Sequence, residues 1–181
     1  MVIDNEDVGF ITSFLNGDEE CFNRIVRKYQ QKVYYLALRI MSNHHDAEDV
    51  SQEAFVRVYR SLKHLKERQY FWTWLYRITL NLCFTKIKKK RYDESINLTR
   101  EISDTKATCY VEDIEKQEIK QEIKKVLNTL PKQQKAVFIL RIYDDLKFEE
   151  IAEIMGLSIG GAKSNFFNAV EKIKERVKRW L

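Results

Sequence analysis

The sequence is poor in the residues that turn a chain. It contains one proline and five glycines among 181 residues, which disfavours an all-β fold because such folds need many tight turns. It also lacks any run of 18 apolar residues, so we expect no membrane-spanning helix and no membrane insertion. The opening residues 1–7 are acidic and do not form a signal-peptide pattern. These absences predict a cytoplasmic protein.

Cysteine and histidine are also scarce. The three cysteines, Cys21, Cys83 and Cys109, are odd in number and far apart, so they imply no disulfide framework. Neither they nor the three histidines have the spacing of a metal site or a catalytic group, and no glycine-rich phosphate loop occurs. We therefore expect reduced cysteines, no metal, no cofactor and no enzymatic activity.

Charged residues, by contrast, are abundant and unevenly distributed. They make up 33% of the chain, and the hydrophobic content of 44% is enough for a core. Residues 1–92 carry a net charge of +5, residues 93–113 carry −4, and residues 114–181 carry +4. Two basic blocks separated by an acidic spacer favour a polyanionic partner for both blocks.

Apolar residues recur at three and four positions through most of the chain, which predicts an all-α fold. The pattern is lost only across 93–113, which we interpret as a flexible acidic linker between two small helical domains, 1–92 and 114–181. We expect Asp46 to cap the third helix and Pro131 to open a later one. The expected helices are 6–17, 18–41, 47–62, 70–91, 114–127, 131–143, 148–155 and 159–179.

The most informative segment begins at Phe71. It places four aromatic residues within 71–76 and then five cations within 86–91. On a helix, Phe71, Leu75, Ile78 and Leu82 would form one stripe, and Arg77, Asn81 and Lys88 would lie opposite. Aromatic and basic groups together are typical of single-strand nucleic-acid grooves. A buried aromatic core with a solvated basic helix end remains the alternative interpretation.

A second signal lies between Phe148 and about Arg179. A short helix, a turn at Gly156–Ser158 and a longer helix form a helix-turn-helix pattern, in which Ser158 can cap the second helix. An ordinary pair of antiparallel helices would have similar spacing. The predicted apolar stripe of the second helix consists of Ile159, Ala162, Phe166, Val170, Ile173 and Val177.

Together, in this order, these motifs resemble the extracytoplasmic-function (ECF) group of bacterial sigma-70-type RNA polymerase sigma factors. The segment DAEDVSQEAFVRVY at 46–59 is similar to region 2.2, Phe71–Asn81 to regions 2.3 and 2.4, and 130–137 with 146–164 to region 4. Only the linker stands where larger sigma factors have a region 3 domain. The resemblance covers nearly the whole chain.

The resemblance implies a role for each matched residue. Core polymerase, through the coiled coil of its β′ subunit, would bind Asp46, Glu48, Asp49, Gln52, Glu53 and Arg57, and its β flap would contact the second domain. The melted −10 strand would bind Lys63, His64, Lys66, Arg68, Trp72, Trp74, Arg77, Asn81, Lys86, Lys88, Lys89, Lys90 and Arg91. The −35 duplex would bind Ser158, Gly161, Lys163, Ser164, Asn165, Phe167 and Asn168. The group also implies an anti-sigma factor as a further partner.

One departure from the family pattern concerns the predicted reading helix. Asn165 and Asn168 stand where arginine is common in the family. Bidentate arginine contacts favour guanine and asparagine contacts favour adenine, so we expect a −35 preference richer in A and T or a weaker dependence on that element. A stand-alone helix-turn-helix regulator is the alternative function. It would explain 131–179 but not the aromatic cluster or the acidic helix at 46–57.

Overall fold

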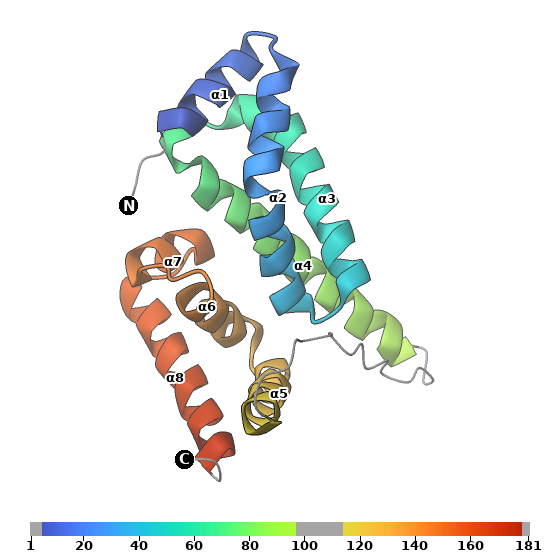
Figure 1. Ribbon diagram of the computed structural model, residues 1–181, viewed down its shortest axis with the longest axis vertical. Helices are drawn as coiled ribbons and strands as arrows, with labels where there is room; N and C mark the ends of the chain where they lie inside the picture. The colour runs from blue at the N-terminus through green and yellow to red at the C-terminus, as the bar shows by residue number, and fades with distance from the viewer. Residues whose placement is uncertain (1–4, 97–113, 179–181) are drawn as a thin grey trace. The chain divides into compact units, whose positions relative to one another are not determined.

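A computed structural model of the chain describes residues 5–96 and 114–178 (Figure 1). The described residues form α-helices joined by short turns and contain no strand, which confirms the all-α prediction. They gather into two compact units. The helices up to Lys89 make up the first unit, and the second holds α5, α6 and α8 with most of α7. Most of the predicted linker, 97–113, lies outside the described residues.

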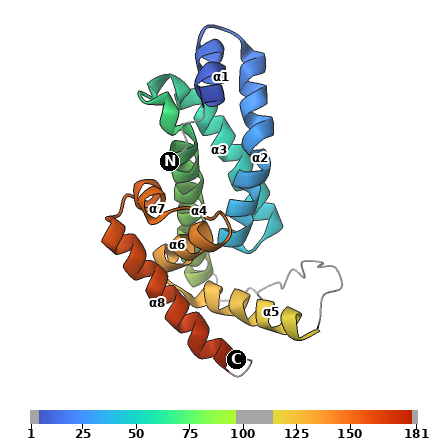
Figure 2. The same cartoon turned by 60° about the vertical axis from the view of Figure 1, so that its left-hand side comes forward.

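The first unit is a bundle of four helices with two short 3₁₀ turns between the last two. Its helices pack in sequence order, α1 on α2 and α2 on α3, and α4 runs behind α2 and α3 in Figure 1 and beside α3 in Figure 2. The elements are α1 (Asn5–Leu15), α2 (Glu19–Met41), α3 (His44–Ser61), η1 (Leu62–His64), η2 (Arg68–Tyr70) and α4 (Phe71–Ile96).

The caps of these helices differ from the prediction at one place. Asp18 caps α2 by accepting a hydrogen bond from the backbone N–H of Glu20 at 3.1 Å. Asn43, not Asp46, caps α3: its side-chain oxygen accepts from the N–H of Asp46 at 2.9 Å, and the helix begins at His44. An asparagine in extended backbone is a strong N-cap, so the helix forms three residues earlier than expected.

The core of the first unit includes most of the predicted stripe of α4 and extends beyond it, while Ile78 of that stripe is only half-buried. Ile25, Val33 and Leu36 of α2 are fully buried, as are Phe71 and Leu75 of α4. The α4 helix, however, is buried over more of its circumference than its stripe predicted, because five further residues are also buried. These are Thr73, Tyr76, Thr79, Leu80 and Cys83.

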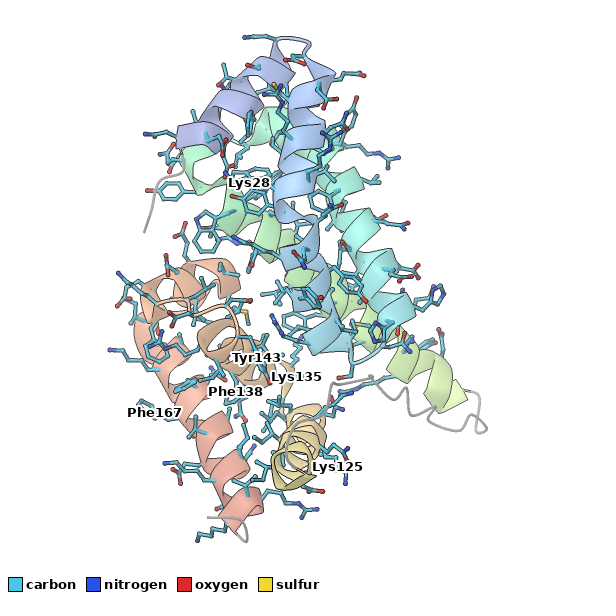
Figure 3. The ribbon with its side chains drawn as sticks, in the orientation of Figure 1. Lys28, Lys125, Lys135, Phe138, Tyr143 and Phe167 are labelled. Atoms are coloured by element: carbon cyan, nitrogen blue, oxygen red, sulfur yellow. The ribbon has the colours of Figure 1, made fainter. Side chains whose placement is uncertain are left out.

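Helix α1 is fastened to α2 by a buried carboxylate. Asp7 is 2% exposed; it accepts a hydrogen bond from the Tyr29 hydroxyl and lies 2.7 Å from the Lys28 ammonium. Lys28, labelled in Figure 3, also reaches Glu6 at 3.0 Å. Since a carboxylate is stable in a core only when it is paired and hydrogen-bonded, these contacts fix where α1 can sit.

The second unit is a smaller bundle in which α8 packs against α5 and α6 (Figures 1 and 2). Phe138 of α6 stacks on Phe166 of α8 with ring centroids 6.1 Å apart, and Leu130 and Ile173 join the same core. Pro131 precedes α6 rather than opening it. The bounds are α5 (Ile114–Thr129), α6 (Lys132–Ile142), α7 (Phe148–Met155) and α8 (Ile159–Val177).

The turn between α7 and α8 has the geometry that the helix-turn-helix pattern predicted. Gly156 adopts a positive φ of 65°, which an L side chain rarely does, and the N–H of Leu157 closes the turn on the carbonyl of Ala152 at 2.9 Å. Ser158 then caps α8 by accepting from the N–H of Gly161 at 3.0 Å. Ile159 of the predicted apolar stripe is exposed instead because it lies at the first position of its helix, and Ile142 at the last position of α6 is exposed as well.

We predict that Asp7→Ala lowers the free energy of unfolding by about 1–3 kcal/mol, because it leaves the buried Tyr29 hydroxyl without its acceptor. Urea unfolding of the full chain followed by circular dichroism measures this. Glu6→Ala is the matched control, since Glu6 contacts the same lysine from an exposed position, and its effect should stay within about 0.5 kcal/mol. Equal losses in the two variants would contradict the buried anchor.

Candidate polymerase and nucleic-acid interfaces

An acidic surface on α3 carries most of the residues predicted to bind polymerase. Glu48, Asp49, Gln52 and Glu53 are all exposed and occupy two successive turns. Glu53 forms an ion pair with Arg57 one turn later, with Oε1 and Nε 2.8 Å apart. We call these four residues the acidic face. A carboxylate and amide face on a rigid helix can bind a basic protein surface and repels nucleic acid.

Asp46, which was predicted to bind polymerase with these residues, is buried and lies outside the acidic face. It is 4% exposed and lies 3.2 Å from the Lys86 ammonium, which also contacts Asp49 at 2.7 Å. Burial by itself lowers the pKa of Lys86, but the hydrogen bonds to Asp49 and Asp46 outweigh it and raise that pKa above its usual value. Lys86, which the resemblance assigned to the −10 strand, therefore joins α4 to α3 in this structure.

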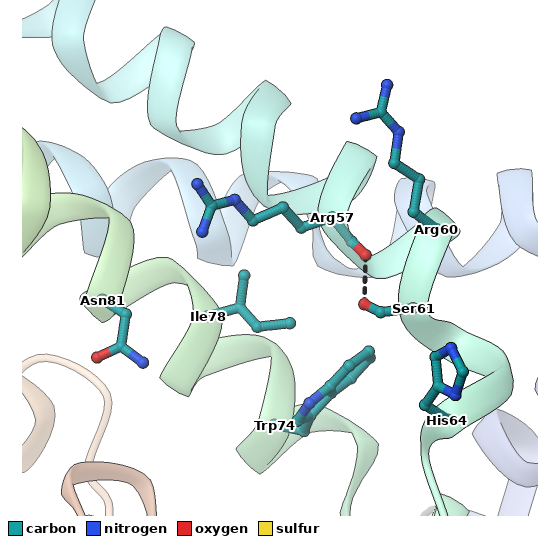
Figure 4. Close-up of a pocket in the computed structure, with 7 residues that line it drawn as sticks. All are labelled: Arg57, Arg60, Ser61, His64, Trp74, Ile78 and Asn81. Atoms are coloured by element: carbon teal, nitrogen blue, oxygen red, sulfur yellow. Dashed lines mark hydrogen bonds between the residues drawn. The ribbon is translucent and has the colours of Figure 1, made fainter.

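An open hollow of about 510 Å³ lies between α3, η1 and α4 (Figure 4). The Trp74 side chain projects from α4 toward α3, with Ile78 beside it. Two guanidinium groups, an imidazole, a hydroxyl and an amide surround this apolar surface, and no carboxylate lines it. Such a hollow suits a flat ring that carries negative charge nearby, as a nucleotide does. Its lining residues are Arg57, Arg60, Ser61, His64, Trp74, Ile78 and Asn81.

The segment between α3 and α4 contributes exposed cations and one internal contact. Lys63, His64 and Lys66 are exposed, as a strand-binding role requires. Arg68 is half-buried and donates from Nη1 to the Thr12 hydroxyl at 2.7 Å, which ties η2 to α1. Arg68 thus holds the segment between α3 and α4 against α1.

The basic residues 88–91 of α4 are exposed, and they lie before the C-terminal end of the helix. The helix continues to Ile96, and no cation lies in its last turn, where the negative end of the helix dipole lies. Trp72 is half-buried and packs edge-on against Tyr76, with ring centroids 5.7 Å apart. Exposed cations and amides nevertheless follow the outer side of α4 at Arg77, Asn81, Lys88, Lys89, Lys90 and Arg91.

The outer side of α8 is polar apart from one ring. Lys163, Ser164, Phe167 and Asn168 are exposed, and we call them the reading face. Phe167 is 60% exposed and projects away from the α8 core contacts in Figure 3.

The other residues predicted to bind the −35 element have structural contacts in α8. Asn165 is half-buried, and the Ser158 oxygen is engaged in the cap. A Cβ on Gly161 would come within 3.1 Å of the Ser158 Oγ. Gly161 and Ser158 therefore shape the start of the helix.

Comparison with known proteins agrees with this arrangement. Residues 25–92 match the family model for Sigma-70 region 2, and residues 120–173 match that for Sigma-70, region 4. The ECF RNA polymerase sigma factor SigW of Bacillus subtilis is 31% identical over 173 residues, which cover 90% of this chain and 91% of SigW. The ECF RNA polymerase sigma-E factor of Escherichia coli K12 is 32% identical over 176 residues, or 89% and 88% of the two chains. This chain belongs to the ECF family of RNA polymerase sigma factors.

Solved structures share the fold of this sigma factor. The sigma factor RpoE of Bartonella quintana, solved in complex with the anti-sigma factor NepR, superposes with a TM-score of 0.70 at 23% identity and covers 87% of this chain and 96% of its own. CnrH, solved in complex with the cytosolic domain of CnrY, gives 0.70 at 18% identity over 96% and 98%. The function of the chain is that of its family, and it directs promoter recognition by RNA polymerase in transcription initiation.

Sequence reasoning missed three residues of the hollow in this sigma factor. Arg60, Ser61 and Ile78 line it, and Arg57, assigned to polymerase binding, lies among them. The signal was present, because residues 57, 60, 61 and 64 recur at three and four positions and so share one side of the chain. Among the described residues, no cluster of His, Cys, Asp or Glu could hold a metal ion. No described helix is long and apolar enough to cross a membrane.

We predict that Asp46→Asn lowers the free energy of unfolding by about 1–3 kcal/mol, because it weakens a buried partner of Lys86. Urea unfolding of the full chain measures the change. Glu48→Gln makes the same chemical change on the acidic face and should alter stability by no more than about 0.5 kcal/mol. An unchanged free energy of unfolding in Asp46→Asn would show that this carboxylate does not hold α3 and α4 together.

Proposed function

We propose that the two domains of this sigma factor, 1–92 and 114–181, divide promoter recognition between them, with 93–113 as the linker. The first domain captures the melted −10 strand, and the second reads the −35 duplex. The observation that carries the proposal is the hollow beside Trp74, flanked by Lys63, His64 and Lys66 and followed along α4 by exposed cations. A stand-alone duplex-binding regulator would have no use for this hollow or for the acidic face.

The acidic face is the proposed docking surface for the coiled coil of the polymerase β′ subunit. Glu48, Asp49, Gln52 and Glu53 present carboxylate and amide groups from consecutive turns of a helix whose other side is buried. Arg57 stands at the junction, since it pairs with Glu53 and also lines the hollow. The second domain makes the other polymerase contact, at the β flap.

The hollow is the proposed receptor for a base that has left the stack. Extruding a base costs a few kcal/mol, and stacking it on an aromatic ring such as Trp74 returns about 1–3 kcal/mol. Stacking alone therefore barely offsets the cost. Cationic contacts to the backbone supply the remainder, and these come from Arg57 and Arg60 at the hollow and from Lys88, Lys89, Lys90 and Arg91 on α4.

The reading face of α8 is the proposed surface for the major groove of the −35 element. In helix-turn-helix proteins the N-terminal residues of the second helix contact base edges, and the reading face occupies this part of α8. Ser158 and Gly161 hold the turn that presents it, and the Ser158 hydroxyl can donate to a phosphate while its oxygen caps the helix.

The factor acts in the cytoplasm with core polymerase, has no chemical step of its own, and needs no cofactor. We infer an anti-sigma factor as its regulator, in line with the complexes in which RpoE of Bartonella quintana and CnrH were solved.

Run-off transcription with core polymerase tests the function directly. We expect specific transcripts from fragments of the source genome when this chain is added and none with core polymerase alone. Absence of a promoter-dependent product on every fragment would contradict the proposal.

We predict that Arg60→Ala and Trp74→Ala each reduce open-complex formation about tenfold or more, in line with the loss of 1–3 kcal/mol of stacking or a comparable phosphate contact. Permanganate reactivity of unpaired thymines measures the melted fraction. Core binding should be unchanged in both variants.

Arg27→Ala is the matched control for Arg60→Ala, because the Arg27 side chain is 72% exposed on α2 and does not line the hollow. Circular dichroism of Trp74→Ala separates a folding defect from a capture defect. Normal melting in the Arg60 and Trp74 variants would show that the −10 strand binds elsewhere.

A further inference from the structure

The two asparagines of α8 have different surroundings, although they lie only three residues apart. Asn165 is half-buried, and its Nδ2 donates to the carbonyl oxygen of Gly161 at 2.9 Å. Asn168 is exposed on the reading face, and no hydrogen bond ties its amide within the described part of the chain. The Asn165 side chain is therefore bound to the backbone of α8, whereas the Asn168 side chain is exposed to solvent.

This difference decides which asparagine can recognise a base. A bidentate contact to adenine uses both ends of the amide, because the side-chain NH₂ donates to N7 and the oxygen accepts from N6. The Asn165 amide is directed back along α8 by its bond to Gly161, so turning it into the groove would break that bond. Asn168 can offer both ends without losing any contact.

We propose that Asn168, and not Asn165, is the specificity-determining residue of α8, and that it selects an adenine in the −35 element. The inference rests on the proposed docking of α8 in the major groove. Guanine presents acceptors at both N7 and O6, so the Asn168 oxygen would face an acceptor there. Asn165 instead positions the first turn of α8 by holding the carbonyl of Gly161.

The expected discrimination is considerable for a single residue. A good bidentate pair distinguishes the right base from the wrong one by roughly 5- to 150-fold. The reading face carries one cation, Lys163, so general phosphate attraction at this face is small and base contacts weigh more in the choice of site.

The test uses the full chain with core polymerase on a template library. Bases upstream of a short pre-melted bubble are randomised, and the transcribed templates are sequenced. Wild type should enrich adenine at one −35 position. Asn168→Ala should reduce that enrichment to less than about threefold, and Asn168→Arg should replace adenine with guanine at the same position. Asn165→Ala is the matched control and should keep the adenine, with circular dichroism to check that α8 still forms.

The other outcomes would contradict either the role of Asn168 or the proposed function of the chain. Loss of the adenine in Asn165→Ala and its retention in Asn168→Ala would overturn the assignment. Transcription from the bubble with no base preference upstream would also overturn it, while leaving the sigma-factor function intact. Failure to transcribe even the pre-melted templates would instead refute the proposed function.

Discussion

The first unit depends on the contact of one lysine with two aspartates. Lys86 of α4 lies between Asp46 and Asp49 of α3 and so sets the register of the two helices that form the hollow. A buried ion pair adds little net stability compared with an apolar packing of the same volume, because both charges lose their hydration. It does discriminate between alternative arrangements, since any slip of α4 along α3 would take the Lys86 ammonium away from the buried Asp46 carboxylate. The geometry of the hollow follows from this requirement.

The direction of the Lys86 pKa shift indicates the pH range in which this contact stabilises the fold. A raised pKa means that folding favours the charged lysine, so its contribution to stability is complete below the pKa of the unfolded chain, near 10.5. The contribution is lost only as the pH rises through the still higher value of the folded state. Physiological changes of pH therefore leave the α3–α4 register intact. Titration of Lys86 therefore does not break this contact in the physiological pH range.

Periodicity and capping rules predicted the helices well because those signals are local. The stripes of α2 and α3, the glycine turn after α7 and the Ser158 cap could all be inferred from neighbours within four residues. Contacts between distant segments could not be inferred in this way. Asp46 and Lys86 were assigned to polymerase and to DNA because each is charged and lies in a motif, whereas their mutual contact spans 40 positions. Arg68 and Thr12 meet across 56 positions in the same way.

Composition alone does not reveal how the reading helix works. Two asparagines in place of arginines suggest a shift toward adenine. The sequence, however, does not show which of the two asparagines contacts the base. Only the hydrogen bond from Asn165 to Gly161 separates them, by engaging one amide within the helix and leaving recognition to the other. A helix that reads with a neutral amide gains base discrimination and little attraction to phosphate. Affinity for the promoter must then come mainly from other surfaces, and α4 offers Lys88, Lys89, Lys90 and Arg91 for that purpose.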